Sequence, residues 1–210
     1  SRNLNYFLAE QQRGHWAASS ADIPRLEDLD GKTILIVGLG GIGTELAKRA
    51  HAFGMRVTAT RASGRTGPDY VSYVGLPDEL LALTRDADFV VNCAPLTPQT
   101  TGVFNSQFFA AMKPTAYFIS VGRGRSTVTT DLIAALQARR LAGAALDVTD
   151  PEPLPSDNAL WRMPNVLITP HVSADTPVAE ELRIAVVREN LRRYVAGEPM
   201  LSVVDIDKGY

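Results

Sequence analysis

Six short apolar runs recur along the chain, separated by segments with a helical or loop-like pattern. They are "TILIVG", "RVTAT", "DFVVNC", "AYFISVG", "AGAALDV" and "NVLIT", which begin at residues 33, 56, 88, 116, 142 and 165. Their apolar character is continuous rather than alternating, as in strands that are buried on both faces. The pattern therefore predicts an α/β fold, a doubly wound parallel sheet with helices on both faces.

Amphipathic segments frame this core. Apolar residues at helical spacing predict an opening helix that includes Leu4, Phe7 and Leu8. A closing helix from about Pro177 to Val195 would carry an apolar stripe of Ile184, Val187, Leu191, Tyr194 and Val195. Internal helix boundaries are expected at Pro77 to Glu79, at Asn105 or Ser106, at Thr130 or Asp131 and, as a helix stop, at Gly143. The proline-rich segment 149–164 predicts a long loop without regular structure.

Composition narrows the possible functions. The 210 residues are 45% hydrophobic and 21% charged, which is ordinary for a globular protein. A net charge of -2 lacks the basic surface that non-specific nucleic-acid binding needs. No uncharged stretch reaches the roughly 20 residues of a membrane-spanning helix and no signal pattern opens the sequence, so we expect a soluble, cytoplasmic protein. The single cysteine, Cys93, has no partner for a disulfide or at metal-ligand spacing, and no metal site is expected.

The stretch after the first run carries a binding motif. Gly38, Gly40 and Gly43 fit the spacing G-x-G-x-x-G, with Gly41 and Ile42 between the last two. A lone match is a weak signal, but this one follows a predicted strand, opens a predicted helix and precedes a second strand. The first glycine would permit a tight turn, the second the approach of a pyrophosphate, and the third close packing of helix on strand. We therefore predict a dinucleotide site here, in preference to a glycine turn without a ligand.

The end of the second strand bears on the choice of cofactor. An acidic residue there would bind the ribose hydroxyls of NAD, but the sequence reads "TATRASGR". Arg61 stands at that point, with Ser63 and Arg65 behind it, and a guanidinium suits the 2′-phosphate of NADP. The sequence favours NADP over NAD, with an arginine that is only a solvated loop charge as the alternative.

Three later segments place polar residues directly after predicted strands: "SVGRGR" at 120–125, "LDVTDPEPL" at 146–154 and "TPHVSADTP" at 169–177. Ligands of an open parallel sheet bind outside the carboxyl ends of its strands, so all three segments would border one cleft. With the glycine motif, the ordered segments "CAPLTPQTTGVFN", "MKPTAYFISVGRG", "LAGAALDV", "EPLP" and "NVLITPHVS" resemble the D-isomer-specific 2-hydroxyacid dehydrogenases over nearly the whole chain. The resemblance implies a catalytic trio of Arg123, Glu152 and His171.

The chemistry of that family suits these residue types. Reduction of a 2-oxo acid needs a hydride from the nicotinamide, a proton for the carbonyl oxygen and a cation for the carboxylate. His171 would exchange the proton, Glu152 would orient it, and Arg123 would hold the carboxylate. The resemblance also places at the cofactor Ala94, Pro95, Thr100, Val121, Gly122 and Asp147, the last of them at the nicotinamide amide. Taken singly, each of these residues also has an ordinary structural explanation.

The resemblance implies a domain organisation as well. Residues 1–24 would be an interdomain helix and linker, 25–175 the NAD(P)-binding Rossmann domain, and 176–210 a helix and tail that return to the substrate domain. Most of that second domain, on the order of 100 residues, would be absent, so we expect cofactor binding with little turnover. The implied substrate is a small 2-oxo or 2-hydroxy acid of the glyoxylate or hydroxypyruvate type, and the implied assembly is a homodimer. A non-catalytic nucleotide-sensing or dimerisation module of corepressor type is the alternative.

Overall fold

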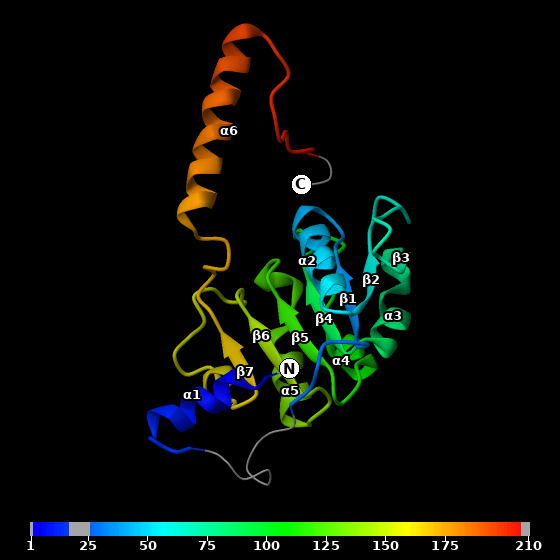
Figure 1. Cartoon of the computed structure of the whole chain (residues 1–210), viewed down its shortest axis with the longest axis vertical. Helices are drawn as coiled ribbons and strands as arrows, with labels where there is room; N and C mark the ends of the chain where they lie inside the picture. The colour runs from blue at the N-terminus through cyan, green and yellow to red at the C-terminus, as the bar shows by residue number, and fades with distance from the viewer. Residues whose placement is uncertain (1, 17–25, 207–210) are drawn as a thin grey trace.

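A single parallel sheet forms the centre of the molecule. The computed structural model describes residues 2–16 and 26–206. Within them, seven strands lie in the order β3-β2-β1-β4-β5-β6-β7 (Figure 1). They are β1 (Thr33–Val37), β2 (Arg56–Thr60), β3 (Tyr73–Gly75), β4 (Phe89–Asn92), β5 (Tyr117–Ser120), β6 (Gly143–Leu146) and β7 (Val166–Ile168). The chain winds outward from β1 first to one side and then to the other, so the predicted doubly wound Rossmann fold is confirmed.

The edge strand β3 is the one strand that the apolar runs did not predict. It has three residues, and its first, Tyr73, is 40% exposed. It pairs with β2, where Tyr73 lies beside Thr58 and Gly75 beside Thr60. Its three residues include a glycine and an exposed tyrosine, so β3 is too short for the continuous apolar run by which the other six strands were recognised.

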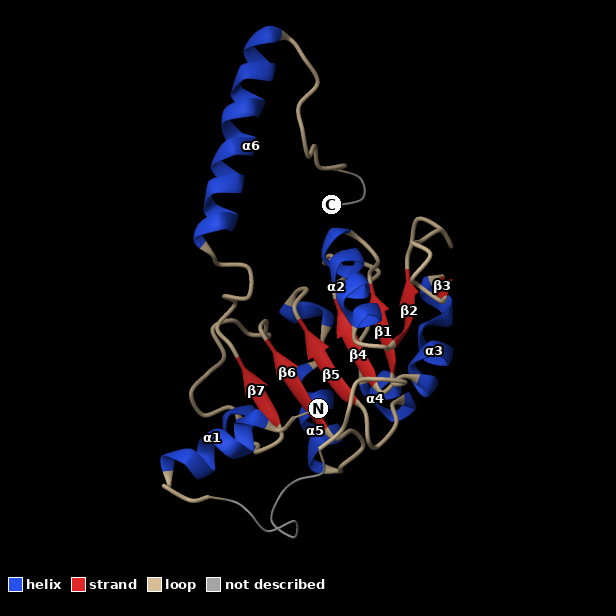
Figure 2. Cartoon of the chain, viewed as in Figure 1, coloured by secondary structure: helices blue, strands red, loops and turns tan. Residues whose placement is uncertain are grey.

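Helices cover both faces of the sheet (Figure 2). Those of the sheet layers are α2 (Gly41–Ala52), α3 (Leu80–Asp86), α4 (Ser106–Ala111) and α5 (Thr129–Gln137). The core beneath α2 is aliphatic and includes Ile36, Ala47 and Val57. The core beneath α3, α4 and α5 is built around four phenylalanine rings in mutual contact, Phe104, Phe108, Phe109 and Phe118. Burial of apolar side chains on both faces stabilises the central strands, and the candidate site lies at their carboxyl ends.

Two of the predicted helix boundaries were wrong. The side chain of Asn105 caps α4 as expected and accepts the N–H groups of Gln107 and Phe108. Asp131, however, does not cap α5, which begins at Thr129; its carboxylate accepts the N–H of Ser106 at 2.7 Å and so links α5 to α4. Gly143 is the first residue of β6, because α5 ends six residues earlier, at Gln137.

The proline-rich segment 149–164 is largely irregular, but the prediction that it has no regular structure was wrong near its carboxyl end. A short 3-10 helix, η3 (Ala159–Arg162), begins after Asn158, whose side chain accepts the N–H of Leu160. Leu160 is 1% exposed and belongs to the core, which fixes this turn. Two other 3-10 turns, η1 (Pro77–Glu79) and η2 (Gly124–Ser126), lie before α3 and α5.

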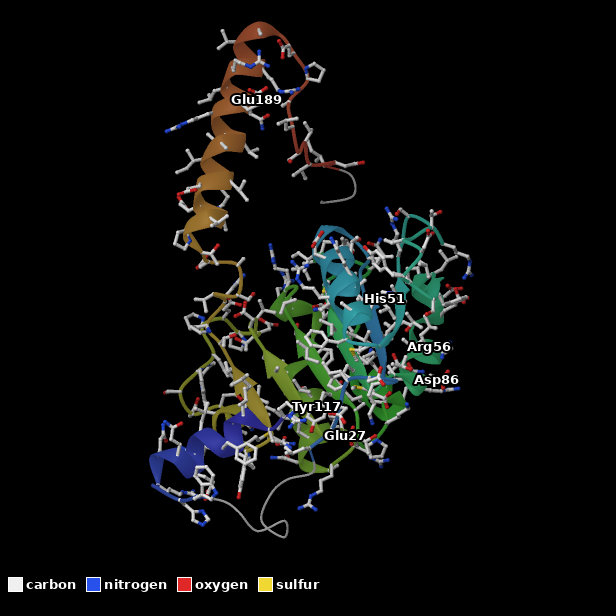
Figure 3. All side chains as sticks on the ribbon, in the orientation of Figure 1. Glu27, His51, Arg56, Asp86, Tyr117 and Glu189 are labelled. Carbon is white, nitrogen blue, oxygen red and sulfur yellow. The ribbon has the colours of Figure 1, made fainter. Side chains whose placement is uncertain are left out.

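The first and last helices lie outside the layered core. α1 (Leu4–Gln12) is near the amino end of β7, where Asn5 Nδ2 donates to the carbonyl of Pro164. α6 (Pro177–Ala196) stands apart from the sheet in Figure 1, and Figure 3 shows Glu189 far from it. No side chain of α6 is buried, and its exposed apolar residues also include Val178, Leu182 and Val186, so they are spread more widely than the predicted stripe. None of the helices in the described ranges combines the length and the apolarity needed to cross a membrane.

Candidate active site

The turn between β1 and α2 combines tightly packed glycines with open ones. Gly38 has a φ of 97°, and a Cβ on it would come within 2.7 Å of the backbone of Ala94. A Cβ on Gly43 would lie 2.2 Å from the carbonyl oxygen of Gly38, so the first turn of α2 packs directly on the strand end. Gly40 and Gly41 face open space, with no atom within 4 Å of a Cβ position. The open glycines leave room for a ligand beside the first N–H groups of α2, which have no partner within the helix.

A buried asparagine that the sequence analysis did not single out joins the ends of β4 and β5. Asn92 is fully buried, and its Nδ2 donates to the hydroxyls of Ser120 at 3.1 Å and Ser126 at 2.9 Å. Its Oδ1 accepts the N–H of Ala94 at 3.1 Å. Gly122 packs on the same amide, since a Cβ on it would lie 3.0 Å away. Asn92 therefore fixes the loops after both strands, and the signal for it was a polar residue that closes the apolar run "FVVN".

The other residues expected at the cofactor differ in how far their side chains are buried. The side chain of Ala94 is buried beneath the glycine turn, whereas Ile42 and Pro95 are exposed at the edge of the sheet. Val121 is partly buried and packs against the α2 side of the core. The hydroxyl of Thr100 donates to the carbonyl of Pro95 at 2.7 Å, so it holds the loop after β4 in place.

Arg61 follows β2 and lies in an exposed loop. Its Nε donates to the hydroxyl of Ser63 at 2.8 Å, and its Nη1 donates to the carbonyl of Thr66 at 2.9 Å. It has no acidic partner among the residues that the structure describes, whereas Arg65 is paired with Glu79 at 2.7 Å. Of the two arginines in this loop, Arg61 is therefore the one whose charge is free to meet an anion.

The last two members of the expected trio are in direct contact. His171 follows β7 and Glu152 follows β6, and Nδ1 of the histidine lies 2.6 Å from Oε1 of the glutamate. Both side chains are partly exposed, at 47% and 42%. Because a carboxylate oxygen accepts hydrogen bonds, Nδ1 carries the hydrogen of this contact, and Nε2 is the ring nitrogen left to face a ligand.

Arg123 lies on the same carboxyl edge, in the turn after β5, but forms no hydrogen bond or ion pair with either residue of that pair. Its Nη1 donates to the carbonyl of Gly122 at 2.8 Å, and it forms no ion pair with any described residue. The side chain is exposed, so most of its fork of donors remains available for a planar anion such as a carboxylate.

Asp147 organises the loop that carries His171. The residue is 6% exposed, and its two carboxylate oxygens accept four hydrogen bonds. Two come from the hydroxyls of Thr169 and Ser173, each at 2.6 Å, and two from the N–H groups of Val172 and Ser173, at 3.1 and 3.2 Å. Burial opposes ionisation of this carboxyl, but these hydrogen bonds outweigh it and lower its pKa to about 2.

The backbone of Asp147 supports the same loop. Its carbonyl accepts the N–H of His171 at 2.8 Å, and the φ of His171 is 54°. Since a carboxylate has about four acceptor sites, the four bonds occupy Asp147 within the chain. The expected role at the nicotinamide amide stays a prediction, and it requires that one of these bonds be exchanged.

Comparison with known proteins decides the family. The family model for "D-isomer specific 2-hydroxyacid dehydrogenase, NAD binding domain" matches residues 1–173. The chain belongs to this family. Glyoxylate/hydroxypyruvate reductase A of Salmonella typhi is 36% identical over 175 residues, which are 83% of this chain and 55% of that protein. The family that the ordered motifs indicated is thereby confirmed.

Two solved structures share the fold of the chain. The NADPH-dependent glyoxylate/hydroxypyruvate reductase from Sinorhizobium meliloti, in complex with NADP and sulfate, has a TM-score of 0.83 and 32% identity. D-lactate dehydrogenase from Lactobacillus jensenii, with NAD+, has a TM-score of 0.82 and 27% identity. The first match covers 100% of this chain and the second 97%, but they cover only 65% and 64% of the relatives. This member of the family thus spans less than two thirds of their length.

Proposed function

We propose that this chain is the nucleotide-binding part of an NADP-dependent reductase of small 2-oxo acids, of the glyoxylate or hydroxypyruvate type. The observation that carries the proposal is the contact of 2.6 Å between His171 and Glu152 at the carboxyl edge of the sheet. The similarity to the glyoxylate/hydroxypyruvate reductases of Salmonella typhi and Sinorhizobium meliloti supports the substrate class. Arg61 supports the cofactor, because it offers a free guanidinium where an NAD site has an acid.

The residues present fit a dinucleotide. The open side of Gly40 and Gly41 and the amino end of α2 would hold the pyrophosphate, and Arg61 would hold the 2′-phosphate. Pro95, Val121 and Gly122 belong to the loops that would line the nicotinamide half, and Ala94 lies buried beneath them. When bound, the nicotinamide supplies the hydride for reduction and takes it back in oxidation.

The trio would transfer the proton and bind the substrate carboxylate. Because Nδ1 of His171 is committed to Glu152, Nε2 would give a proton to the carbonyl oxygen in reduction and remove the hydroxyl proton in oxidation. The Glu152 carboxylate fixes the orientation of the ring and the position of its Nδ1 hydrogen. Arg123, which has no ion-pair partner in the described part of the chain, would bind the substrate carboxylate through two parallel hydrogen bonds.

Cofactor choice is tested by titrating this chain with NADPH and NADH and following nicotinamide fluorescence. We expect tighter binding of NADPH, and we expect Arg61→Gln to weaken NADPH binding about tenfold or more while NADH binding is unchanged. Arg65→Gln is the matched control, because that guanidinium is already paired with Glu79. Tighter binding of NADH by the unmodified chain would contradict the NADP assignment.

Catalysis is tested in a chimera, because the chain spans only 55% of the Salmonella reductase. The chain replaces the matching part of that protein, and reduction of glyoxylate and hydroxypyruvate is followed at 340 nm, the usual NADPH absorbance. His171→Gln should lower kcat by about two to four orders of magnitude, and His51→Gln, on the last turn of α2, should leave it unchanged. Equal activity of His171→Gln and the parent would overturn the assignment. The isolated chain should reduce both substrates slowly. Rapid reduction by it would contradict the proposal that the chain is only the nucleotide-binding part of the reductase.

A further inference from the structure

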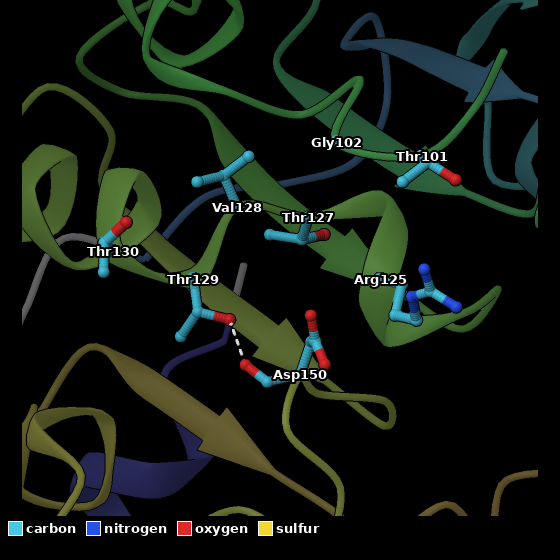
Figure 4. Close-up of a pocket in the computed structure, with 8 residues that line it drawn as sticks. All are labelled: Thr101, Gly102, Arg125, Thr127, Val128, Thr129, Thr130 and Asp150. Atoms are coloured by element: carbon cyan, nitrogen blue, oxygen red, sulfur yellow. Dashed lines mark hydrogen bonds between the residues drawn. The ribbon is translucent and has the colours of Figure 1, made fainter. Parts of the chain in front are cut away.

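A cavity beside the 3-10 turn η2 is lined by residues other than those of the proposed active site. Its volume is about 430 Å³, and it is bounded by the loop after β4, the start of α5 and the loop after β6 (Figure 4). None of the proposed catalytic or cofactor residues lines it. The cavity therefore needs an explanation of its own.

Two opposite charges line this cavity without partners. Arg125 and Asp150 both reach it, yet they form no ion pair with each other, nor with any other residue in ranges 2–16 and 26–206. The carboxylate of Asp150 also accepts no hydrogen bond there; the bond of 2.6 Å from the Thr129 hydroxyl goes to its backbone carbonyl. Each charge is thus free to pair with a group of the opposite sign on a ligand.

A buried hydroxyl is the second sign of a ligand. Thr127 is 8% exposed, and its Oγ1 is shielded from solvent without a hydrogen-bond partner among the described residues. Figure 4 shows this oxygen on the side of the cavity where Arg125 and Asp150 lie. Buried hydroxyls in native proteins are nearly always hydrogen-bonded, because an unmet one is unfavourable.

The amino end of α5 completes one wall. No side chain caps this nine-residue helix, and the N–H groups of Thr129 and Thr130 have no partner in the part of the chain that the structure covers. Free N–H groups at a helix start attract an anion. Together with Arg125, they make this wall suited to a carboxylate, while Asp150 suits an ammonium group.

We propose that the cavity binds a small zwitterion of the α-amino acid class. Its carboxylate pairs with Arg125 and the start of α5, its ammonium group pairs with Asp150, and the Thr127 hydroxyl, which is shielded from solvent, reaches the carboxylate by rotation about χ1. A simple anion would be repelled by Asp150 and a simple cation by Arg125, so a molecule that carries both charges satisfies the cavity best.

The position of the cavity couples it to the trio. Arg125 lies two residues after Arg123, and Asp150 lies two residues before Glu152. A ligand that bridges Arg125 and Asp150 would fix the turn after β5 relative to the loop after β6. The effect of this ligand on turnover rests on the proposed function, whereas the binding of the ligand does not, so binding and effect can be tested separately.

Binding is measured by ¹H–¹⁵N NMR of this chain without cofactor, with glycine as the probe. Saturable shifts are expected at the amides of residues 125–130 and 150, and acetate and methylamine, which each carry one of the two charges, should bind at least tenfold more weakly. Arg125→Gln and Asp150→Asn should each weaken glycine binding at least fivefold. Arg140→Gln and Asp157→Asn, at exposed positions away from the cavity, are the matched controls.

Thr127→Val separates a ligand contact from a structural role. Because the hydroxyl has no protein partner, this isosteric variant should unfold at the same or a higher urea concentration than the parent, while its glycine affinity falls. No saturable shift with glycine would overturn the proposal, and so would equal binding of acetate, which would mean an anion site alone. In the reductase chimera, glycine at saturation should change kcat, and Asp150→Asn should remove that effect.

Discussion

The carboxylate of Asp147 offers a quantitative test of how the His171 loop is held. In Asp147→Asn, one carboxylate oxygen becomes an NH2 group. One pair of donors, either Thr169 and Val172 or the hydroxyl and N–H of Ser173, then faces another donor. The variant therefore loses charge-assisted hydrogen bonds while side-chain volume is kept, and the bond from the His171 N–H to the residue 147 carbonyl stays in place.

The size of the loss follows from the pKa. Asp147 has a pKa of about 2 in the folded chain, against an ordinary value of 3.8. A difference of this size corresponds to about 2 kcal/mol of stability at neutral pH. Because the folded pKa is the lower one, this contribution is fully present above about pH 4 and is lost as the pH falls through the folded pKa near 2. At pH 3 about 1 kcal/mol should remain.

Urea unfolding of the parent chain and of Asp147→Asn, at pH 7 and at pH 3, measures the effect. The free energy of unfolding should differ by about 2 kcal/mol at pH 7 and by about half of that at pH 3. Asp157→Asn is the control, since Asp157 is exposed and its side chain makes no hydrogen bond within the described residues. A loss below about 0.5 kcal/mol at pH 7, or a loss that does not shrink at pH 3, would refute the reasoning.

Three further changes test the rest of the site. Gly43→Ala places a Cβ 2.2 Å from the carbonyl of Gly38, so it should displace α2 and abolish NADPH binding, as fluorescence titration would show. Gly40→Ala, whose Cβ meets no protein atom, should keep the parent's melting temperature yet weaken NADPH binding; a stability loss equal to that of Gly43→Ala would contradict the packing argument. Asn92→Ala leaves two hydroxyls and an N–H group without their partner, so urea unfolding should show a loss of roughly 3 kcal/mol, and a loss below 1 kcal/mol would argue against the network. Glu152→Gln in the reductase chimera should lower kcat, because the amide can present its NH2 group to Nδ1 of His171 and then no longer holds the ring in one orientation, and an unchanged kcat would remove Glu152 from that role.

The sequence was sufficient for the parts of the fold that repeat a strong local pattern. Six strands could be predicted from their continuous apolar runs, although β7 is not buried on both faces, since Leu167 is 53% exposed. The spacing of Gly38, Gly40 and Gly43 marked the turn that the structure has. The edge strand β3 was not predicted because it has only three residues, one of them a glycine, and so forms no apolar run. Asp131 was expected to cap its own helix but bonds to α4, a tertiary contact that no local pattern specifies.

The same distinction holds within the candidate site. That Glu152 and His171 follow neighbouring strands could be predicted from their order, because the carboxyl ends of parallel strands meet at one edge. The long-range hydrogen bonds of Asn92 and of the Asp147 side chain could not be predicted. Their partners lie 28 and 34 positions from Asn92 and 22 to 26 positions from Asp147, and they are chosen by how the loops fold over the sheet. Polar residues that end buried strands are the general signal for such networks, and they identify the anchor but not its partners.

Under the proposed function, the separation of Arg123 from the His171 and Glu152 pair follows from what each residue would have to do. If the guanidinium paired with Glu152, it would neutralise the carboxylate that orients His171 and would use the donors needed by a substrate carboxylate. In the structure, Nη1 of Arg123 is turned back to the carbonyl of Gly122, and Glu152 is engaged by the imidazole instead. The loop after β6 thus places Glu152 beside His171, and the turn after β5 leaves Arg123 without an ion-pair partner among the described residues. A substrate with a carboxylate next to a carbonyl would need both groups at one edge of the sheet, because its carboxylate requires a cation and its carbonyl oxygen requires a separate proton donor.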